Sequence, residues 1–180
     1  AHIQDYPLGG YILFGRDFEA QTPESVRATV ADYQAASRLP LLIAVDEEGG
    51  TVCRVSSYSA FRSSRFPSPR NLYDTGGLDL ISETEDEKCQ LLLSVGINVN
   101  MAPVCDVTTD PDAFMYSRSL GQSPEMTGQF VETVTAVMSE KGVGSVLKHF
   151  PGYGNNTDTH IGIATDERTL EELQIADLVP

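Results

Sequence analysis

Short apolar runs separated by helix-like segments place the strongest constraint on the fold of this chain. Such runs cover residues 9–15, 39–46, 97–104 and 143–150. The first two show no alternation of apolar and polar residues, which is typical of parallel strands buried on both faces. The sequence therefore predicts four buried strands in a parallel sheet.

Each predicted strand is followed by a segment with the end signals of a helix. Thr22 is a predicted N-cap with Pro23 at the first helical position, and Ser123 with Pro124 opens a later helix in the same way. Residues 56–75, a polar stretch with two prolines, are expected to form no regular element. The predicted helices cover residues 22–37, 83–95, 123–141 and 165–173.

The alternating order of strands and helices predicts right-handed parallel βαβ units. A polar cluster follows each predicted strand, at residues 15–19, 46–50, from 106 onward and 148–160. In a (β/α)8 barrel the active site is built from the loops after the strands, whereas an open doubly wound sheet gathers its chemistry at one switch point. A complete barrel takes about 250 residues. The fold class expected for these 180 residues is therefore α/β, as an incomplete (β/α)8 TIM barrel.

The charge balance limits the classes of partner. With 12 basic and 26 acidic side chains the formal net charge is −14, so the chain repels a polyanion and nucleic acid is not an expected partner. No run of about 18 apolar residues is present, so no membrane-spanning segment is expected. The first ten residues lack the charged and apolar regions of a signal peptide. Cytoplasmic and cell-envelope or extracellular locations both remain open.

The cysteines indicate neither a disulfide framework nor a zinc site. Cys53, Cys89 and Cys105 are odd in number and widely spaced. They are predicted to be buried small hydrophobes.

One segment holds several side chains that could act in catalysis or binding: Lys148-His149-Phe150-Pro151-Gly152-Tyr153-Gly154-Asn155-Asn156-Thr157-Asp158-Thr159-His160. Asp158 and His160 point to the same side if the loop is locally extended, so that a carboxylate could orient an imidazole for general acid/base catalysis. The more common outcome for an Asp-x-His sequence is an ordinary loop histidine beside a turn-capping aspartate. A metal site formed by His149, Asp158 and His160 is a third interpretation, which the ammonium of Lys148 disfavours.

Three segments of this chain resemble motifs of one enzyme family. KHFPGYGNNTDTH is similar to the K-H-F-P-G-H-G loop followed by D-S-H in the β-N-acetylhexosaminidase branch of the family 3 glycoside hydrolases. GGYILFGRDFE resembles the second-strand motif G-G-x-I-L-F-x-R-N-F, and LLIAVDEEGGTVCRV resembles the third-strand motif V-D-x-E-G-G-x-V-x-R. The motifs occur in the family's order. The resemblance implies that residues 1–180 are part of one N-terminal barrel domain, roughly strands 2 to 5 with their helices.

The resemblance also implies roles for single residues. His160 is expected to be the general acid/base and Asp158 the group that orients it. Glu48 matches a motif glutamate and is expected to be a buried acceptor, while Gly49 and Gly50 are expected to form a tight turn. Taken alone, each of these residue types has a more ordinary structural role. The residues expected to bind the sugar are Asp46, Arg54, Arg118, Lys148 and His149.

The implied reaction is hydrolysis, with retention of configuration, that releases terminal β-linked N-acetylglucosamine or N-acetylhexosamine. Its substrates would be small carbohydrates such as peptidoglycan or chitin fragments, with no metal or organic cofactor. The nucleophile is expected to be an aspartate outside this chain, so that the chain alone would not turn over. The alternatives are a catalytically silent carbohydrate-binding module, and a β-glucosidase or glycoside phosphorylase on the same scaffold.

The dyad loop departs from the family pattern at two points. Tyr153 stands where histidine is common, and three residues instead of four separate Gly154 from Asp158. The dyad residues themselves are kept, so the acid/base chemistry is expected to be kept as well. The preference among N-acetylated sugars is the property these departures affect.

Overall fold

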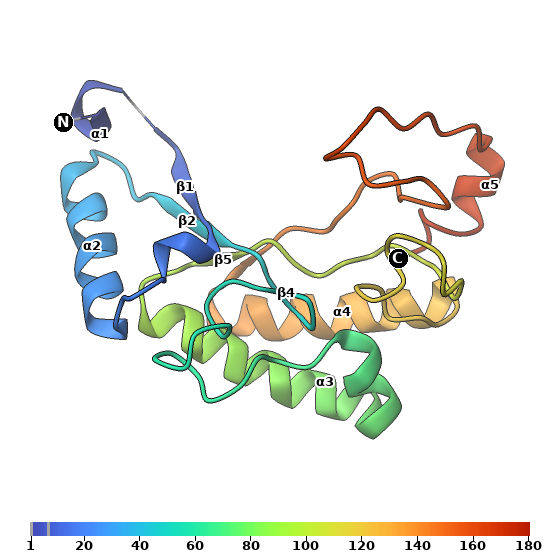
Figure 1. Ribbon diagram of the computed structural model, residues 1–180, viewed down its shortest axis with the longest axis horizontal. Coiled ribbons are helices and arrows are strands. Elements are labelled where there is room, and N and C mark those ends of the chain that lie inside the picture. The colour runs from blue at the N-terminus through green and yellow to red at the C-terminus, as the bar shows by residue number, and fades with distance from the viewer. Residues whose placement is uncertain (1, 7) are drawn as a thin grey trace.

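A four-stranded parallel sheet forms the centre of the protein (Figure 1). The computed structural model describes residues 2–6 and 8–180. The strands are ordered β1-β2-β5-β6 along the sheet, and each neighbouring pair is parallel. Among the described strands the order follows the chain without the reversal that defines a doubly wound sheet. The strands are β1 (Gly10–Leu13), β2 (Leu42–Val45), β5 (Val99–Asn100) and β6 (Gly144–Ser145).

Helices pack on the sheet but leave part of it exposed, as at Ile12 and Leu42, so the strands are not buried on both faces as predicted. The boundaries of two helices confirm the sequence prediction. In α2 (Pro23–Ala36) the Thr22 hydroxyl accepts a hydrogen bond from the backbone N–H of Ser25, as an N-cap does. The helix α4 (Pro124–Lys141) begins after Ser123 in the same way and ends at Gly142 in the left-handed conformation. The other helices are α1 (His2–Asp5), α3 (Pro69–Ser94) and α5 (Leu170–Gln174), with a 3-10 turn η1 at Gly15–Asp17.

The predicted start of the second helix, at residue 83, was wrong. The helix α3 begins at Pro69, because Ser68 caps it and proline is tolerated in the first turn of a helix. The helical conformation is interrupted at Gly76 and Gly77, where Gly77 has a φ of 64°, and this break concealed the helical periodicity. The last helix begins at Leu170 after the N-cap Thr169, and not at residue 165.

The strands are shorter than predicted, and one hairpin was missed. The strands β3 (Glu47–Gly49) and β4 (Val52–Cys53) form a small antiparallel sheet directly after β2. Beyond β5 and β6 the pairing continues as an isolated parallel bridge between Val104 and Lys148. The chain therefore leaves regular structure early at the carboxyl ends of the strands, where the polar side chains gather.

Two groups of buried apolar side chains stabilise this arrangement. Val26 and Val30 of α2 pack with Ile43 of β2 in the first group. The second group fills the space between α3 and α4, which run side by side along the sheet (Figure 1). Full burial of each such side chain contributes about 1.5–3 kcal/mol.

The cysteines form no disulfide. Cys53 and Cys89 are buried as predicted, while Cys105 is only half-buried. Within the described part of the chain, no helix is both long enough and apolar enough to cross a bilayer.

Candidate active site

Lys148 joins two carboxylates of the segment that follows β2. Its Nζ lies 2.6 Å from Asp46 Oδ1 and 2.6 Å from Glu48 Oε1. Asp46 comes directly after β2, and Lys148 lies beyond β6, next to its bridge with Val104. The parallel sheet thus brings together side chains that are far apart in the sequence.

Arg118 binds the same glutamate through two parallel hydrogen bonds. Its Nε donates to Glu48 Oε2 at 2.9 Å and its Nη2 to Glu48 Oε1 at 2.7 Å. The Glu48 side chain is 1% exposed and that of Arg118 is 13% exposed. Burial alone lowers the pKa of Arg118, but the hydrogen bonds and charge of Glu48 and two further carboxylates raise it above its ordinary value. Glu48 is the buried acceptor that the motif indicated, and its charge is shared by two cations.

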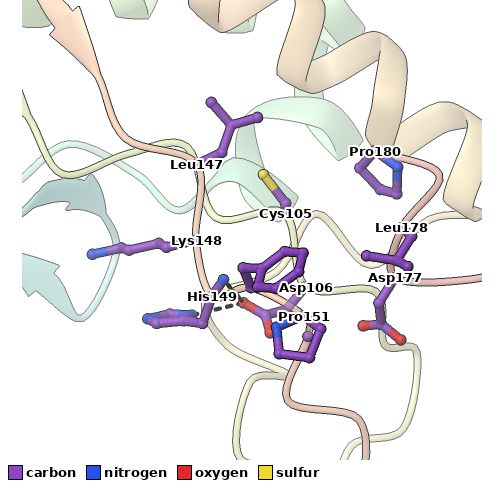
Figure 2. A pocket seen from close by; sticks show the side chains of 11 residues that line it. Cys105, Asp106, Leu147, Lys148, His149, Pro151, Asp177, Leu178 and Pro180 are labelled. Carbon is purple, nitrogen blue, oxygen red and sulfur yellow. Dashed lines mark hydrogen bonds and ion pairs between the residues drawn. The ribbon is translucent and has the colours of Figure 1, made fainter. Parts of the chain in front are cut away.

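His149 is held between a carboxylate and an arginine. Asp106 Oδ2 lies 2.8 Å from His149 Nδ1 and also accepts the backbone N–H of His149 at 3.1 Å (Figure 2). On the other side of the ring, Nε2 lies 3.2 Å from Arg118 Nη2. Arginine has only donors, so Nε2 accepts this hydrogen bond and Nδ1 donates its hydrogen to Asp106. Six residues therefore form one connected polar cluster: Asp46, Glu48, Asp106, Arg118, Lys148 and His149.

The backbone of Arg54 is held by the buried carboxylate of Glu47. Glu47 accepts the backbone N–H groups of Arg54 and Val55, both at 2.8 Å, and the hydroxyl of Ser56. These bonds shape the hairpin of β3 and β4. The Arg54 Nε is buried and has no hydrogen-bond partner among the described residues. Because an unsatisfied buried donor costs about 1–3 kcal/mol, this guanidinium is suited to donate a hydrogen bond to a ligand oxygen.

Asp158 and His160 pair with each other in a long loop, the dyad loop (residues 152–168). His160 Nδ1 lies 2.6 Å from Asp158 Oδ1, which also accepts the His160 backbone N–H at 2.9 Å. The hydrogen bond from the backbone N–H of His160, and after it the bond from the His160 ring, hold the pKa of Asp158 below its usual value. The charge of Arg118 acts in the same direction. The His160 side chain is 79% exposed. Among the described residues, no hydrogen bond joins this dyad to the polar cluster.

The three residues of the possible metal site, His149, Asp158 and His160, do not form one group in the structure. His149 is engaged by Asp106 and Arg118, while Asp158 and His160 are paired in the dyad loop. Within residues 2–6 and 8–180, no group of three or more histidine, cysteine, aspartate or glutamate side chains is arranged to hold a metal ion.

A cavity of about 210 Å³ lies beside the polar cluster and is lined mainly by apolar groups. Leu147, Leu178 and Pro180 contribute to its wall (Figure 2). The head groups of Lys148 and His149 extend away from this C-terminal segment (Figure 2). Asp106, Lys148 and His149 of the polar cluster also line this cavity.

The arrangement supports two kinds of chemistry. The polar cluster combines carboxylates with fixed cations, which can bind vicinal hydroxyls through several charge-assisted hydrogen bonds. An exposed imidazole with a carboxylate on Nδ1 can give and take a proton through Nε2.

All 180 residues match the glycosyl hydrolase family 3 N-terminal domain. The chain belongs to glycosyl hydrolase family 3. A β-hexosaminidase of Alkalilimnicola ehrlichii is 36% identical over 182 residues, which cover 96% of this chain and 50% of that protein. This membership confirms the resemblance indicated by the three sequence motifs.

Solved structures of family 3 proteins have the same fold. A β-N-acetylglucosaminidase of Paenibacillus superposes with a TM-score of 0.88 at 29% identity, covering 99% of this chain and 34% of that one. NagZ of Neisseria gonorrhoeae superposes with a TM-score of 0.84 at 30% identity, covering 96% of this chain and 51% of that one. The chain spans about half the length of the curated relatives it matches.

One member of the polar cluster, Asp106, was not predicted from the sequence to be a functional residue. Asp106 was noted only as the start of a polar stretch after the third predicted strand. Its carboxylate accepts His149 through Oδ2 and the backbone N–H of Tyr153 through Oδ1, at 2.8 Å. The available signal was an aspartate directly after a buried run, at the same edge of the sheet as His149.

Proposed function

We propose that the protein containing this chain is a retaining β-N-acetylhexosaminidase that releases terminal β-linked N-acetylglucosamine. The observation that carries the proposal is the hydrogen bond between His160 Nδ1 and Asp158 Oδ1 in the loop that follows Lys148 and His149. The relatives named β-hexosaminidase and the similar β-N-acetylglucosaminidase structure support the substrate class.

The polar cluster and Arg54 would bind the hydroxyls of the sugar at the cleaved bond. Asp46 is a carboxylate acceptor beside the ammonium of Lys148, and the buried Nε of Arg54 is a donor without a partner among the residues that the structure describes. Arg118 would reach the same sugar, while its two bonds to Glu48 fix the direction of its guanidinium. Groups fixed in this way orient the ring before reaction without further ordering.

His160 would act as general acid and then as general base. In the first step, an aspartate outside this chain attacks the anomeric carbon, and protonated His160 gives its Nε2 proton to the departing glycosidic oxygen. In the second step, His160 takes a proton from water, the water oxygen attacks the anomeric carbon, and the aspartate leaves as carboxylate. Asp158 keeps hydrogen on Nδ1 in both steps, so that Nε2 always faces the reaction.

The fold part of the proposal is that residues 1–180 supply roughly strands 2 to 5 of a (β/α)8 barrel and belong to one domain. The strand order without reversal supports a barrel over a doubly wound sheet. The polar cluster lies after the carboxyl ends of β2, β5 and β6, where barrel enzymes place their active sites.

A silent carbohydrate-binding module is the second candidate. The exposure of His160 and the absence of a hydrogen bond, among the described residues, between the dyad and the polar cluster favour it. In this function the polar cluster would bind a sugar, and the dyad would have no reaction to catalyse.

The deciding test is an assay of the full-length protein with 4-nitrophenyl N-acetyl-β-glucosaminide and the matching glucoside, with and without phosphate. Phosphate-independent release from the N-acetyl substrate is the expected result. Release that requires phosphate would indicate a phosphorylase, and preference for the glucoside would indicate a β-glucosidase. Turnover of neither substrate by folded protein, together with N-acetylglucosamine binding, would establish the silent module.

A further inference from the structure

Tyr153 is fixed on three sides next to the polar cluster. Its ring stands edge-on to His149, with centroids 5.2 Å apart and an interplanar angle of 87°, and packs against Phe114 at 5.2 Å. Its backbone N–H donates to Asp106 Oδ1 at 2.8 Å. The aspartate that orients His149 therefore also sets the position of Tyr153.

The hydroxyl of Tyr153 reaches the dyad itself. Tyr153 Oη lies 2.7 Å from Thr159 Oγ1, and Thr159 is the residue between Asp158 and His160. The remaining hydrogen bonds of residues 157–161 are local, from the backbone and ring of His160 to Asp158 and from Ile161 to Asp158. Within the described residues, the bond from Tyr153 is thus the hydrogen bond that links the dyad segment to the anchored part of the site.

The ends of the dyad loop are held separately by Arg168. Its Nη2 donates to the carbonyl of Gly152 at 2.9 Å and to Asp166 Oδ2 at 2.6 Å, and its Nη1 pairs with buried Asp177. Gly154 has a φ of 55°, a left-handed conformation that favours glycine, and a Cβ there would lie 2.7 Å from Arg168 Cζ. Between these fixed ends the loop extends away from α3 and α4 (Figure 1).

We propose that Tyr153 is a positioning residue whose hydroxyl, through Thr159, holds the Asp158–His160 dyad in its working orientation. This inference rests on the proposed function, since it assigns an acid/base role to His160. The bond connects the dyad to the polar cluster through the backbone of Tyr153 and Asp106. Among the described residues, no hydrogen bond joins the dyad directly to the polar cluster, so this indirect connection links them.

The test uses the full-length protein and variants that remove single hydroxyls. Tyr153→Phe and Thr159→Val each remove one partner, Thr159→Ser keeps the hydroxyl, and Tyr33→Phe is a matched control in α2, where the ring of Tyr33 packs on Tyr11. Loss of one hydrogen bond is expected to lower kcat/KM about two- to tenfold for N-acetylglucosaminides with poor leaving groups. The double variant should lose no more than either single variant, because both changes break the same bond.

The dependence on the leaving group separates positioning from general damage. A 2,4-dinitrophenyl group departs without protonation, so the first step should be nearly unchanged in Tyr153→Phe. Azide, which attacks the glycosyl-enzyme without a general base, should restore the second step and give the glycosyl azide. Equal losses for all leaving groups, or additive losses in the double variant, would overturn the proposal.

Hydrogen exchange provides a readout that does not need turnover. Tyr153→Phe and Thr159→Val should speed exchange of the amides of residues 157–161 to the same extent, and Thr159→Ser and Tyr33→Phe should not. Unchanged exchange in Tyr153→Phe would refute the positioning role even if the enzyme is active. Faster exchange in these two variants, combined with a wild-type protein that turns over no substrate, would support the bond while refuting the proposed hydrolase.

Discussion

Arg118 binds Glu48 side-on, with Nε 2.9 Å from Oε2 and Nη2 2.7 Å from Oε1. Because the same carboxylate also binds Lys148 at 2.6 Å, Glu48 compensates two cations in a largely buried place. Glu48→Gln should lower the free energy of unfolding by about 3–5 kcal/mol, the usual effect of removing one partner of a buried ion pair. Denaturant unfolding of the full-length protein measures it.

A surface pair provides the control for this prediction. Glu87 is 56% exposed and pairs with Arg62, and such pairs contribute about 0–1 kcal/mol. Glu87→Gln should therefore leave the unfolding midpoint almost unchanged. Equal effects of Glu48→Gln and Glu87→Gln would show that Glu48 is not the anion shared by Arg118 and Lys148.

A second buried ion pair lies behind the site, between Lys88 and Glu85 of α3. Their side chains are 6% and 3% exposed, and Lys88 Nζ also contacts the carbonyl of Glu48 at 3.4 Å. Glu85→Ala should destabilise the protein by about 3–5 kcal/mol because it leaves the Lys88 ammonium buried and unpaired. The double change of Glu85 to leucine and Lys88 to methionine should restore most of this loss. Thermal unfolding of both variants checks the prediction, and a double variant as unstable as the single one would contradict it.

The cysteines are expected to resist alkylation at pH 8 in the folded protein. Burial raises the pKa of Cys89 to about 12 and that of Cys105 to about 11, so both thiols stay protonated. Iodoacetamide labelling followed by mass spectrometry should modify them only after unfolding. Rapid labelling of native Cys89 would show that its thiol is not buried as described.

Asp166 should titrate far below an ordinary aspartate. The side-chain hydrogen bonds from Arg168, followed by its backbone N–H, lower the pKa of Asp166 to about 2. A depressed folded-state pKa means that the interaction is fully present above the ordinary aspartate value and is lost as pH falls toward 2. Carboxyl NMR should show this titration, and in Arg168→Gln the value should return toward normal. A wild-type Asp166 that titrates near 4 would contradict the contacts that hold the dyad loop.

The elements predicted well from the sequence are those determined by local signals. The ends of α2 and α4 depend on Thr22, Ser123 and Gly142, each of which acts on its own turn of helix. The pairing of Asp158 with His160 is likewise local, since the two residues are separated by one position. The first half of α3 was missed because Gly76 and Gly77 break its periodicity.

Features set by tertiary contacts could not be predicted in the same way. The hairpin of β3 and β4 depends on Glu47, whose carboxylate accepts three consecutive backbone N–H groups after β4. The role of Asp106 depends on the neighbouring strand that carries His149. Family resemblance indicated the residues of the polar cluster other than Asp106, but only the fold shows that Glu48 lies between its two cations.

The central claim is that His160 carries the proton in glycoside cleavage. It is tested most directly by kcat/KM of the full-length protein and of His160→Ala with an N-acetylglucosaminide that has a poor leaving group. The account predicts a loss of about 10²- to 10⁴-fold in the variant, with its fold and its binding of N-acetylglucosamine retained. Undiminished turnover by folded His160→Ala would contradict it.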